Sequence, residues 1–138
     1  MSGMKTDFGV LGVNEHVVGG DCNSQSGNEV ISVLALAEIA GLSTGLVSTA
    51  RITHATPAAA YAHTVERGWE DIFSILEASI TAGCEDIAAQ LINVKVNQER
   101  KFPNIDVDGL DVVLGGGAGH FLPRTVVHES GFQGLRND

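Results

Sequence analysis

Apolar residues recur with helical spacing in the segment SGNEVISVLALAEIAG, which runs from Ser26 to Gly41. Ser26 and Glu29 form a capping box at its start, and Gly41 fits a C-terminal cap. The apolar residues between them fall on one helical stripe. The pattern therefore predicts a helix over residues 28–40.

Two segments have the apolar, β-branched character of strands. LSTGLVST carries no charge, which is typical of a strand covered on both faces, and it predicts a strand at residues 43–49. LDVVLGGG, at residues 110–117, predicts a second strand that runs into a glycine turn. Because helical patterns lie between the two, the order predicts a parallel crossover in an open α/β sheet.

Three helical patterns lie between these strands. Pro57 fits the first turn of a short helix through AAAYAH. EDIFSILEASITAG predicts a helix that ends at Gly83, and CEDIAAQLINV predicts another that begins at once. The polar segment QERKFPNIDVDG, with Pro103 and Gly109, predicts a surface connection.

Composition and net charge exclude some classes of function. The 138 residues are enough for about one domain, and 43% apolar with 18% charged residues indicates a globular chain. Eight Lys and Arg against seventeen Asp and Glu give a net charge of -9, which argues against a nucleic-acid partner because phosphate backbones need a basic face. No run approaches the roughly 18 apolar residues of a membrane helix. The first residues, MSGMKTDFGVLG, resemble the interior of a fold, so we expect an internal portion of a longer protein.

The sequence contains two cysteines, Cys22 and Cys84. They can form at most one bridge, and neither has the spacing of a zinc-binding motif. Spacing alone leaves open a structural disulfide or two buried thiols.

Candidate chemistry follows the first predicted strand, where open α/β sheets bind ligands. His54 and Thr56 would project the same way from an extended chain and could address one point, such as a hydrated cation. A His near a Thr is nevertheless more often a hydrogen-bonded loop residue. Arg67 offers a planar fork of donors suited to a phosphate, but spacing alone favours a surface ion pair with Glu66 or Glu70.

Other motifs favour structural roles. GGGAGH matches the dinucleotide fingerprint only in part, since His120 replaces the last glycine, and a tight turn is the better interpretation. Tyr61, His63 and Trp69 are expected to pack around the short helix. The serines lie in no G-x-S-x-G elbow, and no carboxylates cluster at metal-binding spacing.

The segment THATPAAAYAHTVER resembles the alkaline phosphatases, a family of metal-dependent phosphomonoesterases. The resemblance continues upstream through GMKTDFGVLGVNEHVVGGDCNSQSGNEVISVLALAEIAGLSTGLVSTARI and downstream through GCEDIAAQLI and GLDVVLGGGAGHFLP, so it covers nearly the whole chain in order. It implies an α/β fold that is part of a doubly wound, mostly parallel sheet flanked by helices. Residues 1–138 would be a single, incomplete domain.

The resemblance also implies roles for particular residues. Thr56 matches the hydroxyl residue that coordinates magnesium, and His54 matches a position near that metal. Arg67 matches the arginine that grips the substrate phosphate. Cys22 and Cys84 match the disulfide of animal-type members, which favours an oxidising compartment.

Members of the family attack the phosphate ester with a zinc-activated serine and pass through a phosphoserine. The resemblance places that serine and the zinc ligands outside these residues. It thus implies Zn²⁺ and Mg²⁺ in the complete enzyme, no catalytic residue in this stretch, and no hydrolysis by the stretch alone. It also implies phosphate monoester substrates, a homodimer, and an extracellular, periplasmic or cell-surface location, with any membrane anchor outside this stretch. The alternative is a non-catalytic α/β module that binds phosphate or a partner.

Overall fold

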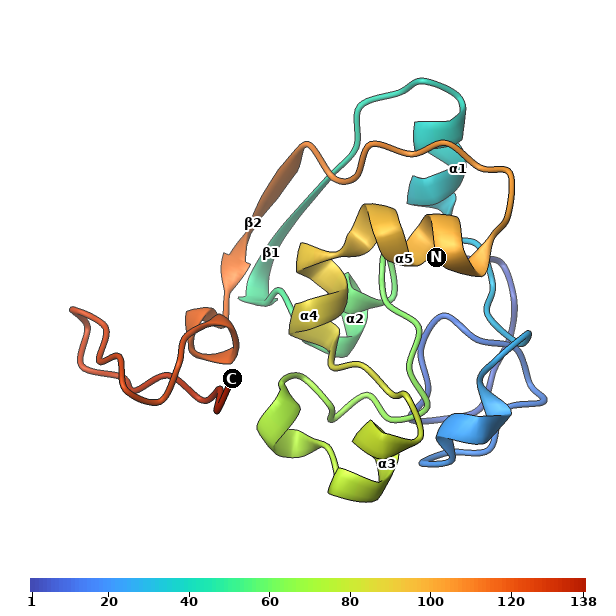
Figure 1. Ribbon diagram of the computed structural model, residues 1–138. Coiled ribbons are helices and arrows are strands. Elements are labelled where there is room, and N and C mark those ends of the chain that lie inside the picture. Colours follow the sequence, from blue (N-terminus) through green and yellow to red (C-terminus); the bar gives the residue numbers. More distant parts are fainter.

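The computed structural model describes residues 1–138 and has a two-stranded parallel sheet flanked by helices (Figure 1). Strand β1 (Gly45–Arg51) pairs with β2 (Val112–Gly116), and Val47 lies opposite Leu114. The chain between the strands is helical and returns to the same sheet. This confirms the predicted parallel pairing and agrees with an incomplete, doubly wound α/β fold.

One core lies between the sheet and the helices. A helix precedes β1, and four helices connect the strands; they are α1 (Val33–Ile39), α2 (Ala55–Ala58), α3 (Glu77–Thr81), α4 (Ile87–Ile92) and α5 (Val94–Lys101). Ala58, Tyr61 and Ile87 are fully or almost fully buried, and Leu46 of β1 packs against them. The core thus joins α2 and α4 to one face of the first strand.

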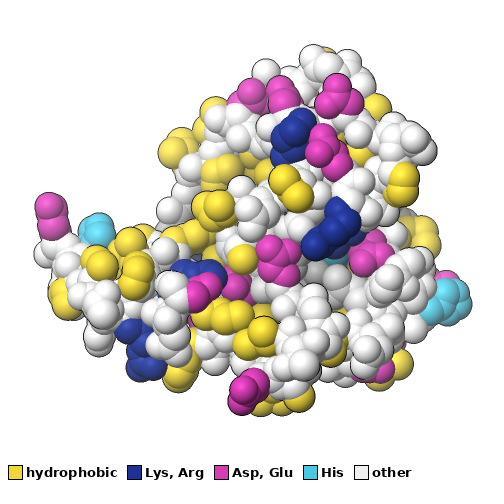
Figure 2. Space-filling view, viewed as in Figure 1, with side chains coloured by type: hydrophobic (Ala, Val, Ile, Leu, Met, Phe, Trp, Pro, Cys, Tyr) yellow, Lys and Arg dark blue, Asp and Glu magenta, His cyan; other side chains and the backbone are white.

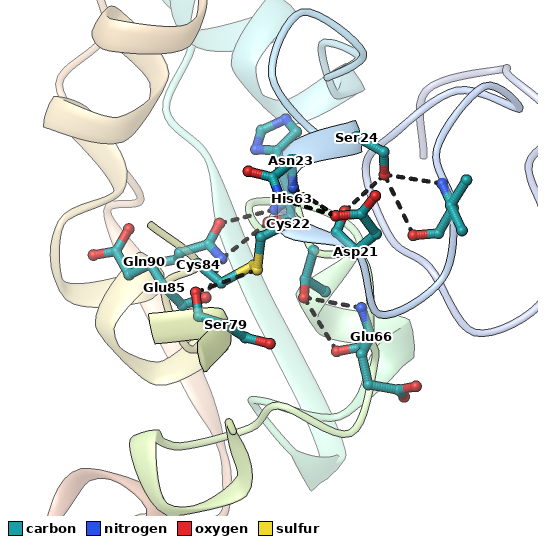
Figure 3. Close-up of a disulfide and its surroundings, with 12 residues drawn as sticks. Asp21, Cys22, Asn23, Ser24, His63, Glu66, Ser79, Cys84, Glu85 and Gln90 are labelled. Carbon is teal, nitrogen blue, oxygen red and sulfur yellow. Dashed lines mark hydrogen bonds between the residues drawn. A yellow bond between two sulfur atoms is a disulfide. The ribbon is translucent and has the colours of Figure 1, made fainter. Parts of the chain in front are cut away.

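A second core lies beneath the loops on the side of α3. It contains six buried residues, Val10, Val13, Val17, Val65, Trp69 and Ile75. The disulfide between Cys22 and Cys84 packs against this core and joins two segments 62 residues apart, with their Cα atoms at 5.7 Å (Figure 3). The disulfide that the family resemblance implies is therefore present, and there are no free thiols.

Helix α1 is shorter than the predicted helix over residues 28–40. It begins at Val33, because the Ser32 hydroxyl accepts a hydrogen bond from the Ala35 N–H and caps it. The residues before it pair with another segment instead, as in the bridge between Val13 and Glu29. The helix start predicted from the capping box at Ser26 was therefore wrong. The backbone N–H and C=O groups of residues 28–30 form hydrogen bonds with residues 12–14 instead of the bonds of a longer helix. Gly41 follows the helix with a φ of 75°, as predicted.

Strand β1 lies two residues later than predicted, and only one of its faces is covered. Its side chains alternate between half-buried and exposed positions. Val47 is 78% exposed, and Leu114 beside it is 59% exposed. The prediction that both faces are covered was wrong for this chain, although the apolar residues themselves suit such cover. Apolar side chains reach the surface in several places on the face seen in Figure 2.

The expected helices after β1 are also broken up. Helix α2 begins at Ala55, ahead of Pro57, and the rest of AAAYAH forms turns. EDIFSILEASITAG forms a 3-10 turn, η2 (Ile72–Ser74), and the separate helix α3. The Asp71 carboxylate accepts hydrogen bonds from the Phe73 and Ser74 N–H groups and fixes the first turn, and the chain is extended at Ile75 between the two. Local capping therefore overrides the long apolar stripe.

Helix α4 begins at Ile87, where the Asp86 carboxylate accepts a hydrogen bond from the Ala89 N–H. After Asn93, α5 continues the helical path to Lys101, so the predicted surface connection from Gln98 onward starts too early. Gln98 is buried, and its amide donates to the Tyr61 carbonyl at 3.2 Å. The polar Gln98 thus occupies a core-facing position in which a backbone acceptor satisfies its amide N–H, while its Oε1 has no hydrogen-bond partner.

After β2 the chain makes the tight turn that GGGAGH predicts. Gly117 has a φ of 93°, and a Cβ atom there would come within 2.9 Å of the Arg51 Cβ. Only glycine fits both requirements. The turn leads into a short 3-10 segment, η3 (Ala118–Phe121).

The last residues, 122–138, loop out to the left of the helices in Figure 1, and only the end of the chain returns towards them. Arg136 donates two hydrogen bonds to the Asp86 carboxylate, at 3.0 and 3.2 Å. Asp86 thus caps α4 and also anchors the C-terminal segment. None of the helices has the length and apolar character that crossing a membrane requires.

Candidate functional site

The end of β1 leads into the first half of the candidate site. After Arg51, the buried residues Ile52 and Thr53 form a turn, and His54 occupies the N-cap position of α2. The His54 backbone is extended, with φ -65° and ψ 153°, and its side chain makes no capping hydrogen bond. Its imidazole is therefore available to other groups. Thr56 lies in the first turn of α2, and its side chain is exposed.

Arg67 supplies the second half from a neighbouring turn. Residues 64–67 run beside residues 9–12, where Leu11 and Thr64 form a bridge and the Arg67 N–H donates to the Gly9 carbonyl at 2.7 Å. Gly12 makes this approach feasible, since a Cβ atom at that position would meet the Ala62 carbonyl oxygen at 2.2 Å. The backbone of the turn is thus held from one side.

The two halves meet through side chains. One Arg67 guanidinium nitrogen lies 3.3 Å from the His54 Nε2. A guanidinium is always a donor, so Nε2 accepts in this contact and the proton of the neutral ring is on Nδ1. The structure thus brings together two of the three residues that the sequence singled out. Thr56 lies two residues after His54 and makes no side-chain hydrogen bond within the chain; because it is already in the helix α2, the extended chain expected to project both side chains the same way is not formed.

Arg67 does not form the surface ion pair that spacing alone favoured. Glu66 accepts a hydrogen bond from the Gly68 N–H, and Glu70 binds Arg51 instead. No carboxylate lies within ion-pair distance of Arg67. The half-buried guanidinium keeps its charge and has no carboxylate to neutralise it, as a binding site for an anion requires.

Three neighbouring aromatic residues have the structural roles predicted for them. Tyr61, His63 and Trp69 are buried, and the Tyr61 hydroxyl donates to the Ile52 carbonyl at 3.0 Å. Burial raises the pKa of Tyr61 and lowers that of His63, to about 3. The charge of Lys101 adds to the effect on His63, so this ring stays neutral in the core.

Sequence reasoning missed an ionic cluster beside the site. Glu70 receives hydrogen bonds from Arg51 and Thr53, and His120 lies next to it. Burial raises the pKa of Glu70, but the hydrogen bonds from Arg51 and Thr53 and the charge of His120 outweigh it and lower the pKa to about 2. The partners lie up to 50 residues apart along the chain, so no local motif signals them. The only hint in the sequence was the pair of carboxylates that follows Trp69.

The residues around His54 and Thr56 do not by themselves form a metal site. No three His, Cys, Asp or Glu side chains lie close enough together to hold a metal ion. Thr56 fits as one oxygen ligand, because its hydroxyl is exposed and uncommitted, and His54 lies beside it. Any remaining ligands have to come from other residues.

Comparisons with known proteins show the family to which the chain belongs. A family model described as alkaline phosphatase matches residues 1–138. An alkaline phosphatase from Gadus morhua is 40% identical over 124 residues, which are 90% of this chain and 24% of that protein. The tissue-nonspecific alkaline phosphatases of Homo sapiens and Gallus gallus are each 36% identical over 124 residues, covering 21% and 22% of those proteins.

The chain spans about a quarter or less of the length of the curated relatives that it matches. The matched residues include both strands, helix α2 with His54 and Thr56, the turn that carries Arg67, and both cysteines. The family uses metal ions and hydrolyses phosphate monoesters. This chain belongs to the alkaline phosphatase family.

Proposed function

We propose that Arg67, oriented by His54, forms a phosphate-binding site, called the phosphate grip below, in an enzyme that hydrolyses phosphate monoesters. The observation that carries the proposal is the Arg67 guanidinium, which lies 3.3 Å from the His54 Nε2 and has no carboxylate partner. An arginine held by a neutral acceptor keeps two parallel N–H groups for a dianionic ligand. Membership of the alkaline phosphatase family supports the same role.

The residues of this chain bind and orient in this proposal. The Gly9 carbonyl holds the backbone of Arg67, and the His54 ring limits the rotation of the guanidinium. Arg67 then donates to two oxygens of the phosphate and neutralises charge that grows in the transition state. His54 has no proton to lose at Nε2, so it acts as an acceptor that orients Arg67.

The metal part of the proposal concerns Thr56 and His54. The exposed hydroxyl of Thr56 would be one oxygen ligand of a magnesium ion, with His54 near that ion. When bound, the metal ions, magnesium and zinc, supply Lewis-acid stabilisation of the phosphoryl oxygens. The nucleophilic serine and the zinc ligands would come from other parts of a longer protein.

Several wider features belong to the same proposal. The substrates would be phosphate monoesters and not nucleic acids, in keeping with the net charge of -9. The complete protein would form a homodimer at an extracellular, periplasmic or cell-surface location. The disulfide between Cys22 and Cys84 suits such an oxidising compartment.

The test uses the complete gene product that contains these residues, with Zn²⁺ and Mg²⁺ supplied. We expect Arg67→Ala to raise the inhibition constant of inorganic phosphate and the KM for p-nitrophenyl phosphate by about tenfold or more, since a charged hydrogen bond contributes about 1.5–3 kcal/mol. Arg100→Ala is the matched control, because Arg100 is an exposed arginine on α5 that contacts Asn97.

Equal constants for both variants would refute the phosphate grip. A protein that binds phosphate through Arg67 but releases no phosphate from any monoester would instead support the non-catalytic module. Phosphate release and phosphate binding by calorimetry are therefore measured on the same preparations.

A further inference from the structure

Glu70 lies where three separate segments of the chain meet. Its carboxylate accepts two hydrogen bonds from the Arg51 guanidinium, at 2.9 and 2.7 Å, and one from the Thr53 hydroxyl at 2.6 Å. Its side chain is only 13% exposed. Paired, short hydrogen bonds to a charged fork are among the stronger polar contacts in proteins, unlike ordinary surface ion pairs.

The segment after β2 is fastened to the same place. The His120 Nε2 lies 3.4 Å from a Glu70 oxygen, and its Nδ1 lies 2.6 Å from Asp71. Asp71 is buried, and it also caps the 3-10 turn that follows. Glu70 and Asp71 therefore hold the ends of both strands against one loop.

This loop also carries Arg67. Local hydrogen bonds make residues 66–70 a tight turn, with the Trp69 N–H donating to the Glu66 carbonyl and the Glu70 N–H to the Gly68 carbonyl. A shift of Glu70 must therefore shift Arg67 on the same turn.

At the other end of the tether, Thr53 immediately precedes His54. Thr53 is completely buried, and its hydroxyl donates to Glu70, so it cannot move without its neighbour. The tether from Glu70 to Thr53 and Arg51 thus spans the same two segments as the contact between Arg67 and His54.

We propose that Glu70 is a positioning residue for the phosphate grip, and that its tether to Arg51 and Thr53 sets the placement of Arg67 relative to His54 and Thr56. The inference rests on the proposed function, since it concerns the same site. A positioning residue of this kind acts through other residues and not by contact with substrate or metal. Glu70 acts by fixing the backbone turn of Arg67 and by engaging the guanidinium of Arg51, so that Arg67 alone binds the phosphate.

The experiment compares Glu70→Gln with Glu66→Gln in the complete enzyme. Glu66 lies on the same turn, and its carboxylate accepts only the local Gly68 N–H, at 3.0 Å. We expect Glu70→Gln to raise the inhibition constant of inorganic phosphate and the KM together by about tenfold, with a smaller change in kcat, because binding of phosphate is weakened in ground and transition states alike. Glu66→Gln should match the wild type.

A second variant covers the case in which Glu70→Gln does not fold. Thr53→Val keeps the ion pair with Arg51 and removes one hydrogen bond to Glu70, so we expect a smaller rise in the phosphate constant, about threefold. A thermal midpoint is recorded for every variant. A lowered midpoint with an unchanged phosphate constant in Glu70→Gln, or in Thr53→Val where Glu70→Gln does not fold, would show a purely structural role and overturn the inference.

Arg67→Ala separates failure of the inference from failure of the proposed function. If Arg67→Ala weakens phosphate binding and Glu70→Gln does not, only the positioning role fails. If Arg67→Ala also leaves phosphate binding unchanged, the phosphate grip itself is wrong, and the positioning role is overturned with it.

Discussion

The two faces of β1 differ sharply in how well they are covered. On the inner face, Leu46 packs against a core in which Ala58 and Ile87 are completely buried. On the outer face, Val47 and its neighbour Leu114 are largely exposed. Parallel strands of this apolar character are normally covered on both sides. The helices of this chain therefore cover only one face of the sheet. The candidate site lies at the end of β1, next to the covered face.

The largest expected effect compares two isoleucines of α4. Ile87 is 0% exposed in the core, whereas Ile92, five residues later, is 73% exposed. We expect Ile87→Ala to lower the free energy of unfolding by about 3 kcal/mol, through lost burial and the cavity it leaves. Ile92→Ala should change it by less than about 0.5 kcal/mol. Urea unfolding followed by Trp69 fluorescence measures both.

Similar losses of unfolding free energy in the two variants would contradict the difference between the covered and exposed faces. They would mean that Ile92 is buried in solution, for instance by self-association of the exposed apolar surface. Sedimentation of the wild-type chain checks that explanation directly.

An effect of about the same size is expected from the disulfide on the side of α3. Replacing both Cys22 and Cys84 by alanine should lower the free energy of unfolding by about 3 kcal/mol, because the bridge closes a long loop in the unfolded chain. Reduction of the wild type should reproduce the loss, and the double variant should not respond to the reductant. A wild type that is insensitive to reduction would show that the second core holds these segments without the bridge.

The smallest expected effect is a dependence on pH from the covered core. The buried His63 ring donates from Nε2 to the Val30 carbonyl at 3.1 Å, and burial together with the charge of Lys101 lowers its pKa to about 3. The unfolded chain binds the extra proton below about pH 6.5, so the free energy of unfolding should fall as the pH falls from about 6.5 towards 3. The slope is at most about 1.4 kcal/mol for each pH unit.

Urea midpoints at pH 7, 6 and 5 measure this slope. The lowered pKa of Glu70, about 2, adds a loss only below its unfolded value near 4.5, outside that window. His63→Gln should remove the slope, and His16→Gln, at an exposed position, should retain it. An equal slope in both variants would place the titrating group elsewhere.

Local patterns located part of the fold well. The second strand, the glycine turn after it and the helix end at Gly41 all follow from residues that are neighbours in the sequence. The helix start at Ser26 failed because the segments around Val13 and Glu29 pair with each other, and such pairing is not visible in a local window. The long helix predicted to end at Gly83 failed where Asp71 caps a separate turn.

The candidate site divides in the same way. His54, Thr56 and Arg67 were singled out from residue type, spacing and family resemblance, and the contact of Arg67 with His54 places two of them together. Their roles toward magnesium and phosphate stay predictions. The ion-pair alternative for Arg67 was wrong because Arg51 takes Glu70, and Arg51 lies on a strand whose end the sequence did not locate exactly.

The sequence by itself determined the family, the order of strands and helices, and the chemical groups available for an anion and a cation, since these depend on residue identity and short-range periodicity. Only the tertiary structure decided which residues each charged side chain contacts. Glu70, Asp71 and His120 meet because a parallel crossover brings the carboxyl ends of both strands to the same end of the sheet. His120 follows Asp71 by 49 residues. Contacts over such separations depend on how whole elements pack, and no local pattern of residues encodes them.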